Sequence, residues 1–145
     1  MTQVDMVREF MRMFGQETPD KQTMPGEELK FLRFKLTDEE NDELYESKTT
    51  TEYFVAVLDK LYVTLGDAVA AGFTAEEVSR GFARVHASNM SKLWTEEEVK
   101  CGVPSGATCV EINSLNNKRF LVKRADGKVI KSASYSPVRF NGIIQ

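Results

Sequence analysis

The sequence predicts a mainly α protein with a short β-ribbon near its C-terminal end. Through most of residues 1–94, apolar side chains recur every three or four positions, which is the period of an amphipathic helix. After residue 95 this period stops, and short strand-like runs follow between turns rich in glycine and proline. We therefore expect a helical domain over residues 1–94 and, packed on it, an extension over residues 95–145 that contains a β-hairpin.

Four helices are expected in the first part of the chain. Gly15 follows the last apolar residue of the first helix, and Pro25 suits the first turn of the second. Gly72 can cap the end of the third helix, and the capping-box pair Thr74 and Glu77 opens the fourth. The expected helices span about residues 3–14, 25–46, 50–71 and 74–93.

The last part of the chain has the features of a β-ribbon. Short runs over residues 109–112 and 119–123 are expected to form strands. Asp126 and Gly127 are typical of a hairpin turn, and a further short run follows at residues 128–131. The sequence contains no internal repeat and no low-complexity segment.

Composition and charge exclude several classes of function. A chain of 145 residues can bury one core without a disulfide or a metal, and Cys101 and Cys109 are expected to be reduced thiols. Residues 1–94 carry 11 Lys and Arg against 17 Asp and Glu, whereas residues 95–145 carry 8 against 5. This acidic balance argues against a nucleic-acid-binding protein. No apolar run reaches about 18 residues and no signal-peptide core is seen, so we expect a cytoplasmic protein without a membrane partner.

Two acids interrupt the apolar stripe of the second expected helix. One arc of about 120° on a helical projection holds Leu29, Leu32, Leu36, Glu40, Glu43 and Leu44. Ionised carboxylates that are removed from water destabilise a fold strongly unless something pairs with them. Mg²⁺ is a suitable partner because it prefers hard oxygen ligands and often binds substrate phosphates as well. The alternative is a solvated acidic face, formed by Glu39, Glu40, Asp42, Glu43 and Glu46.

Two further features of the helices suggest buried or covered positions. Phe31 and Phe34 lie opposite the acidic stripe, so the second helix is apolar on two faces and is expected between layers or at a subunit interface. Asn89 falls on the apolar stripe of the fourth helix. A buried amide at that position would need hydrogen-bond partners.

The acidic motif resembles that of the all-α nucleoside triphosphate pyrophosphohydrolases, the MazG and dimeric dUTPase superfamily. The signature of that superfamily is E-E-x-x-E on one helix and E-x-x-D on the next, around one or more Mg²⁺ ions. Residues 39–43 match the first part, and Asp59 matches the end of the second. The chain is similar to a branch common in bacteria and phages, often labelled phosphoribosyl-ATP pyrophosphohydrolase-like or Cof-like. The similar positions also include Arg33, Leu36, Gly66, Ala68, Gly72, residues 88–93 and 126–131, Tyr135 and Pro137.

One position departs from the signature. Ala56 stands three residues before Asp59, where the superfamily has glutamate. The site would then hold fewer ions or recruit a substitute, and Glu52, one turn further back, is the nearest candidate. The departure also fits a relative with weakened catalysis or a different role.

The resemblance implies catalytic and metal-binding roles. Glu40, Glu43 and Asp59 would hold Mg²⁺, which Mn²⁺ can replace, against the triphosphate of the substrate. Glu39, next to the metal ligands, resembles the carboxylate that activates water. Attack near the α-phosphorus of a nucleoside or deoxynucleoside triphosphate would then yield a monophosphate and pyrophosphate.

Substrate-binding residues follow from the same resemblance. Lys92 and Lys131 would balance phosphate charge, and Asn89 would contact the sugar or the base. Phe14 and Trp94 could stack on a base. The alternatives are a core position for Phe14 and, for Trp94, a cap over the end of the fourth helix.

The resemblance also implies an oligomeric state, and the acidic pocket leaves more than one class of function open. Relatives build their bundles across a two-fold axis, so a homodimer or a dimer of dimers is expected. The same acidic pocket would also suit a protein that sequesters a nucleotide without hydrolysing it, and a helical adaptor with solvated acids is a third possibility. The sequence does not select a base.

Overall fold

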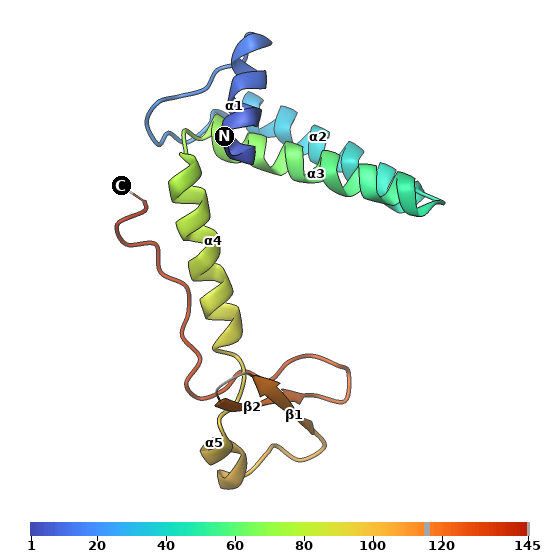
Figure 1. The fold of residues 1–145 in the computed structure, drawn as a ribbon, viewed down its shortest axis with the longest axis vertical. Helices are drawn as coiled ribbons and strands as arrows, with labels where there is room; N and C mark the ends of the chain where they lie inside the picture. Colours follow the sequence, from blue (N-terminus) through green and yellow to red (C-terminus); the bar gives the residue numbers. More distant parts are fainter. Residues whose placement is uncertain (115–116, 145) are drawn as a thin grey trace. The chain divides into compact units, whose positions relative to one another are not determined.

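The computed structural model describes residues 1–114 and 117–144, and within them the protein is mainly helical (Figure 1). Five helices and one two-stranded antiparallel sheet are formed in these residues, which confirms the predicted fold class. The elements are α1 (Gln3–Met13), α2 (Glu27–Glu46), α3 (Thr50–Ala70), α4 (Ala75–Met90), α5 (Glu96–Cys101), β1 (Thr108–Ser114) and β2 (Asn117–Lys123). No helix in the described residues is long and apolar enough to cross a membrane.

The chain divides into two compact units. The first contains residues 1–79 together with Ile143 and Ile144, and the second contains residues 80–142. Helix α4 begins in the first unit and ends in the second. The predicted domain over residues 1–94 with an extension over residues 95–145 stays a prediction.

The core of the first unit lies where α1 packs on α3. Val4, Val7 and Met11 are spaced at one helical turn along α1, and their side chains are buried with Val69 and Ala70 of α3. Thr2 and Asp5 form a reciprocal capping box that begins α1. The partly buried residues Leu29, Leu65, Ala75 and Val78 pack around this core.

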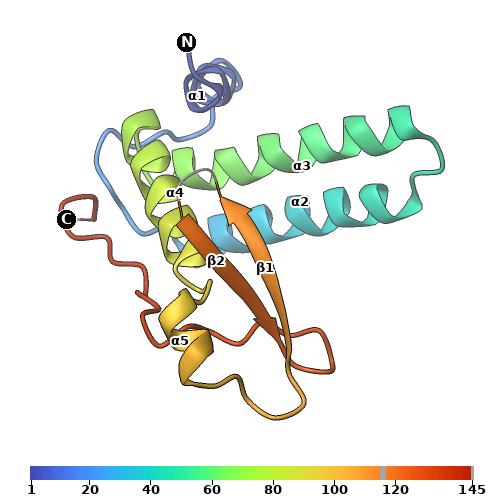
Figure 2. The same ribbon diagram turned by 60° about the horizontal axis from the view of Figure 1, so that its bottom comes forward.

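Helices α2 and α3 form an antiparallel hairpin, and they lie side by side in Figures 1 and 2. Thr49 and Glu52 form the capping box that begins α3. No residue of α2 is buried, and Phe31 and Phe34 are 63% and 61% exposed. Among the described residues, these apolar side chains of α2 are therefore exposed, and the predicted place of the helix at a subunit interface stays a prediction.

The second unit contains the predicted β-ribbon. Strands β1 and β2 pair in antiparallel register, with Thr108 opposite Lys123 and Val110 opposite Leu121. The predicted hairpin turn is also formed, because Gly127 donates its N–H to the carbonyl of Arg124 and has φ 82°. Both strands are longer than the sequence pattern predicted.

Two local features near the end of α4 differ from the sequence analysis. Helix α4 ends at Met90 and not near Leu93, because the Leu93 N–H bonds three residues back and Trp94 then pairs with Phe120 of the sheet. The short helix α5 was not predicted, although Thr95 begins it with a capping box. A helix of six residues is too short to show a helical period in the sequence.

Candidate metal centre

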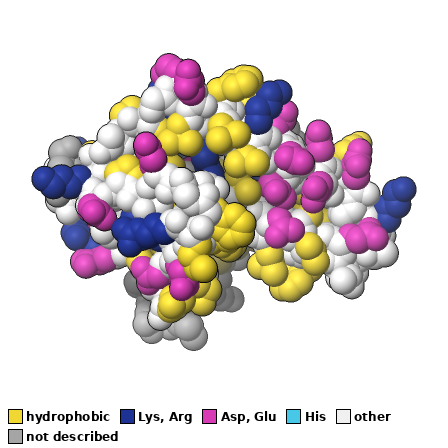
Figure 3. All heavy atoms as spheres, turned by 90° about the horizontal axis from the view of Figure 1, so that it is seen from above, with side chains coloured by type: hydrophobic (Ala, Val, Ile, Leu, Met, Phe, Trp, Pro, Cys, Tyr) yellow, Lys and Arg dark blue, Asp and Glu magenta, His cyan; other side chains and the backbone are white. Residues whose placement is uncertain are grey.

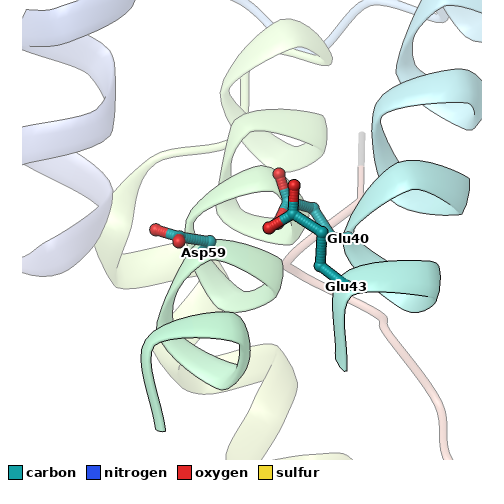
Figure 4. Close-up of side chains that lie close together, drawn as sticks. All are labelled: Glu40, Glu43 and Asp59. Atoms are coloured by element: carbon teal, nitrogen blue, oxygen red, sulfur yellow. The ribbon is translucent and has the colours of Figure 1, made fainter. Parts of the chain in front are cut away.

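Three carboxylates meet between α2 and α3. Glu40 and Glu43 are three residues apart on α2, so they share one face of the helix, and Asp59 comes from the middle of α3. One carboxylate oxygen from each lies within 4.8 Å of the others. Figure 4 shows the side chains of Glu40 and Glu43 next to each other, reaching from α2 toward α3, which carries Asp59. The hairpin thus brings together the three metal-ligand candidates that the sequence analysis named.

Glu40 is the most enclosed of the three. Its Oε2 atom is buried and has no hydrogen-bond partner in residues 1–114 and 117–144. Burial is the main cause of a raised pKa at Glu40, and the charges of Glu43 and Asp59 raise the pKa further. A buried oxygen without a partner, beside two other carboxylates, fits a hard divalent cation such as Mg²⁺.

A hollow of about 400 Å³ lies beside the cluster. Its lining includes Glu43, Glu46, Glu52 and Ala56. Ala56 is buried, and the hollow next to it is where a longer side chain at this position could extend. Glu52 does not join the acidic cluster because its Oε2 accepts hydrogen bonds from the backbone N–H groups of Lys48 and Thr49.

The surface around the hairpin combines acidic and apolar side chains. Figure 3 shows Asp and Glu gathered in its right half, where α2 and α3 lie, next to hydrophobic side chains. Exposed apolar side chains of the hairpin include Phe31, Leu32, Phe34, Phe54, Leu58 and Leu61. The carboxylates are thus bordered by apolar surface.

Glu39, the candidate for activating water, is exposed on α2 next to Glu40. Its charge is among the causes of the raised pKa of Glu40, so the two carboxyl groups interact. Glu39 lies outside the cluster formed by Glu40, Glu43 and Asp59. The structure therefore leaves it available to water.

Four of the five predicted substrate-binding residues lie in the second unit: Asn89, Lys92, Trp94 and Lys131. Asn89 is exposed and not in the core as the apolar stripe suggested, and its Oδ1 accepts a hydrogen bond of 2.7 Å from Lys92 Nζ. Lys131 Nζ lies 4.2 Å from the centre of the Tyr135 ring, which is cation–π distance. Their assignment to substrate binding stays a prediction.

The two aromatic candidates have different surroundings. Phe14, in the first unit, is 70% exposed and stacks on Phe10 with 4.2 Å between ring centres. Trp94, in the second unit, is partly buried, and its Nε1 donates to the carbonyl of Ile130 at 2.9 Å. The ring of Trp94 is therefore held against the ribbon, whereas the ring of Phe14 is largely exposed.

Two interactions near the predicted residues were not anticipated. Arg33 pairs with Asp67 across the hairpin, with 2.6 Å between Nε and Oδ1. Hydrogen bonding to Ser88, followed by the charge of Lys131, lowers the pKa of the Tyr135 phenol against the opposing effect of burial. Both Arg33 and Tyr135 belong to the sequence pattern described above, but helical spacing carries no information about partners so far away in the chain.

Comparison with known proteins agrees with the geometry. Residues 7–89 match the model of the phosphoribosyl-ATP pyrophosphohydrolase family, which is more than half of the chain. The match runs from within α1 to the last turn of α4 and so includes the three carboxylates. No curated protein matches the sequence at a significant level.

Proposed function

Because the chain belongs to the phosphoribosyl-ATP pyrophosphohydrolase family, whose members are nucleotide pyrophosphohydrolases, we propose that it is a Mg²⁺-dependent nucleoside triphosphate pyrophosphohydrolase. It would cleave a nucleoside or deoxynucleoside triphosphate to the monophosphate and pyrophosphate. The observation that carries this proposal is the convergence of Glu40, Glu43 and Asp59, together with the buried Oε2 of Glu40, which has no hydrogen-bond partner in the described residues.

Glu40, Glu43 and Asp59 are the residues that would hold the cation. A bound Mg²⁺ would offset the charge of the phosphates and make a coordinated water more acidic. The three carboxylates come from two helices that are packed together, so the protein holds them close to each other before any ligand arrives. Such preorganisation lowers the cost of assembling like charges when the cation binds.

Glu39 would act as the proton acceptor for the attacking water. The position next to Glu40 places it at the edge of the acidic cluster, and its exposure lets water reach the carboxylate. General-base catalysis requires the base to lie within hydrogen-bond reach of the attacking water.

The test is a panel of nucleoside and deoxynucleoside triphosphates assayed for pyrophosphate release, with Mg²⁺, with Mn²⁺ and with a chelator. We expect release that requires the cation, and a monophosphate as the other product. Release of inorganic phosphate and a diphosphate would contradict cleavage at the α-phosphorus. Release that is unchanged by a chelator would contradict the metal dependence.

A second candidate function is sequestration of a nucleotide without turnover. The observation that favours it is Ala56, a buried alanine at the edge of the hollow where the resemblance calls for a fourth carboxylate. Stabilisation of the fold by a nucleotide with Mg²⁺, together with no pyrophosphate release in the whole panel, would identify this function.

A further inference from the structure

Arg33 of α2 makes two contacts with a single turn of α3. Its Nε donates to Asp67 Oδ1 at 2.6 Å, and its Nη2 donates to the backbone carbonyl oxygen of Val63. The Arg33 side chain is only 12% exposed. Because a guanidinium is planar and its donors are fixed in that plane, two simultaneous bonds define a position along α3 as well as a distance from it.

Gly66 gives the guanidinium room. A Cβ atom at this position would lie 2.9 Å from Cζ of Arg33 and closer still to Nη2. Gly66 is buried in the helical part of α3, where glycine costs about 1 kcal/mol relative to alanine. The absence of a side chain there is explained by the close approach of Arg33.

The contact between Arg33 and Gly66 lies one heptad from the acidic cluster. Seven residues separate Arg33 from Glu40 along α2, and seven separate Gly66 from Asp59 along α3 in the opposite direction. Both steps correspond to about 10 Å of helix. The Arg33–Gly66 contact and the acidic cluster therefore depend on the same register of the antiparallel hairpin. A slide of one helix past the other would displace the partners at both places by the same amount.

Apolar packing alone sets this register weakly. Helix α2 has no buried residue, and Ala56, Val69 and Ala70, with Gly66, are the buried residues of α3. Such small side chains offer little interlocking against a slide along the helix axis. The short connection over residues 47–49 restrains the register at the closed end of the hairpin, and the directional polar contact of Arg33 adds a second restraint nearer the open end.

We propose that Arg33, with Gly66 and Asp67, is a clamp that holds α2 and α3 in the register at which Glu40, Glu43 and Asp59 converge. Arg33 is thus a positioning residue for the cation site, and this inference rests on the proposed function. The clamp would act on the carboxylates only through the positions of the two helices, and its role requires no contact with the substrate.

Loss of the Arg33 charge and loss of the helix register would change the cation affinity in opposite directions. Removing the positive charge of Arg33, about 10 Å along the helix from Glu40, would by Coulomb attraction strengthen the binding of a cation. Loss of register would instead weaken it, since the three oxygens would no longer meet. A weaker cation affinity in a variant without Arg33 is therefore opposite to the effect of charge alone.

The experiment measures Mn²⁺ binding to the full chain by the electron paramagnetic resonance signal of free Mn²⁺, at a temperature where circular dichroism shows every variant folded. For Arg33→Met we expect a loss of about tenfold in affinity, similar to other changes that misplace metal ligands. Arg33→Lys, which keeps the charge but not the planar fork, should lose affinity to a smaller extent. Arg12→Met is the matched control, because Arg12 also pairs with an aspartate, Asp20, outside the hairpin, and it should bind Mn²⁺ as the wild type does.

A double variant tests whether Gly66 acts through Arg33. Gly66→Ala alone should displace the guanidinium and weaken Mn²⁺ binding, whereas adding Gly66→Ala to Arg33→Met should cause no further loss. In that background the alanine should raise the melting temperature, because it is the better helix former.

Failure of the clamp hypothesis and failure of the metal-site hypothesis would give different results. Wild-type affinity in Arg33→Met, or fully additive losses in the double variant, would overturn the clamp while leaving the proposed function in place. A wild-type chain that does not bind Mn²⁺ would overturn the metal site itself, and the clamp as a device for positioning it.

Discussion

At the scale of single residues, Glu40 and Ala56 are the two positions that best test the proposed metal site. Glu40 contributes a buried oxygen to the acidic cluster, and Ala56 contributes a methyl group beside the hollow that the cluster adjoins. Glu40 thus has a buried oxygen without a hydrogen-bond partner in the described residues. Ala56 lacks the carboxylate that the resemblance predicts at its position. The metal site can therefore be tested by removing a carboxylate at Glu40 and by adding one at Ala56.

Glu40→Gln should abolish pyrophosphate release and stabilise the metal-free protein. The raised pKa of Glu40 means that ionisation above the ordinary pKa of 4.5 destabilises the folded state relative to the unfolded chain, and glutamine removes that effect at neutral pH. We expect a rise in melting temperature of roughly 2–5 °C, measured by calorimetry with a chelator present. Asp42→Asn is the control, because Asp42 is an exposed acid of α2 outside the cluster, and it should leave both properties unchanged. Wild-type turnover in both Glu40→Gln and Glu43→Gln would contradict the metal site.

Ala56→Glu should have the opposite effect on the melting temperature of the metal-free protein. A fourth carboxylate extending into the hollow adds negative charge beside Glu43, so the metal-free protein should melt at a lower temperature. Mn²⁺ should then restore more stability than it gives to the wild type, because the added ligand is satisfied only when a cation is bound. Ala56→Gln has nearly the same size without the charge and serves as the control. Equal shifts in melting temperature on adding Mn²⁺ to the two variants would exclude position 56 from the site.

At the scale of secondary-structure elements, α5 is held by one carboxylate. Glu98 accepts hydrogen bonds from the Thr95 and Ser134 N–H groups and from the Ser132 hydroxyl. These bonds, with the Thr95 N–H as the largest contribution and burial in opposition, lower the pKa of Glu98 to about 2. The start of α5 is thereby tied to the segment that follows the ribbon.

Acid should weaken this attachment over a defined range. Since the pKa of Glu98 is about 2 in the folded state and 4.5 unfolded, its contribution to stability is complete above about pH 4.5 and is lost as the pH falls toward 2. Glu98→Gln should lower stability by about 1–3 kcal/mol at pH 7 and remove this part of the acid dependence. Urea unfolding followed by Trp94 fluorescence at several pH values measures both effects. Identical pH profiles for the two proteins would show that the hydrogen bonds of Glu98 contribute little.

The ribbon should contribute to nucleotide binding through Lys131. The resemblance assigns this residue to phosphate contact, so Lys131→Ala should weaken nucleotide binding by on the order of 1–3 kcal/mol, with a smaller effect at high salt. Lys128→Ala, in the same ribbon, is the matched control and should bind as the wild type does. Titration calorimetry with Mg²⁺ and a triphosphate provides the measurement. Unchanged affinity in Lys131→Ala at every salt concentration would limit the ribbon to packing or assembly.

Much of the element pattern was predictable, because the period of apolar residues reports which faces of a helix avoid water. The spacing on α2 and α3 predicted the helices, and it placed Glu40 and Glu43 on one face. It did not predict that Asn89 would be exposed, because spacing cannot show whether the chain supplies a cover for the stripe. The pairing of Arg33 with Asp67 was also inaccessible, since the register between two helices depends on contacts between residues far apart in sequence.

At the scale of the whole molecule, the hairpin carries apolar side chains that are exposed in the part of the chain that the structure describes. Phe31, Phe34 and Phe54 are each more than 60% exposed, and no residue of α2 is buried. Extended apolar surface of this kind is uncommon on monomers and is typical of interfaces between subunits. The expectation of a homodimer or a dimer of dimers is consistent with this surface and stays a prediction.

Solution scattering and sedimentation over a range of concentrations test the assembly. We expect a mass of two or four chains, and a melting temperature that rises with protein concentration, because association stabilises the folded state. Phe31→Glu together with Phe34→Glu should shift the mass toward one chain, whereas Tyr45→Glu, at an exposed aromatic near the end of α2, should do so less. A mass of one chain at every concentration would contradict the prediction.

The first unit is not continuous in sequence, and this has a consequence for the integrity of the chain. Residues 80–142 are inserted between Ser79 and Ile143, and Ile143 is buried in the first unit, where its carbonyl accepts a hydrogen bond from Gln22. The inserted segment acts as a tether that keeps Ile143 at a high effective concentration near its binding place. A proteolytic cut in that segment would turn this attachment into an association between two molecules, so the anchoring of Ile143 in the first unit depends on the covalent continuity of the second.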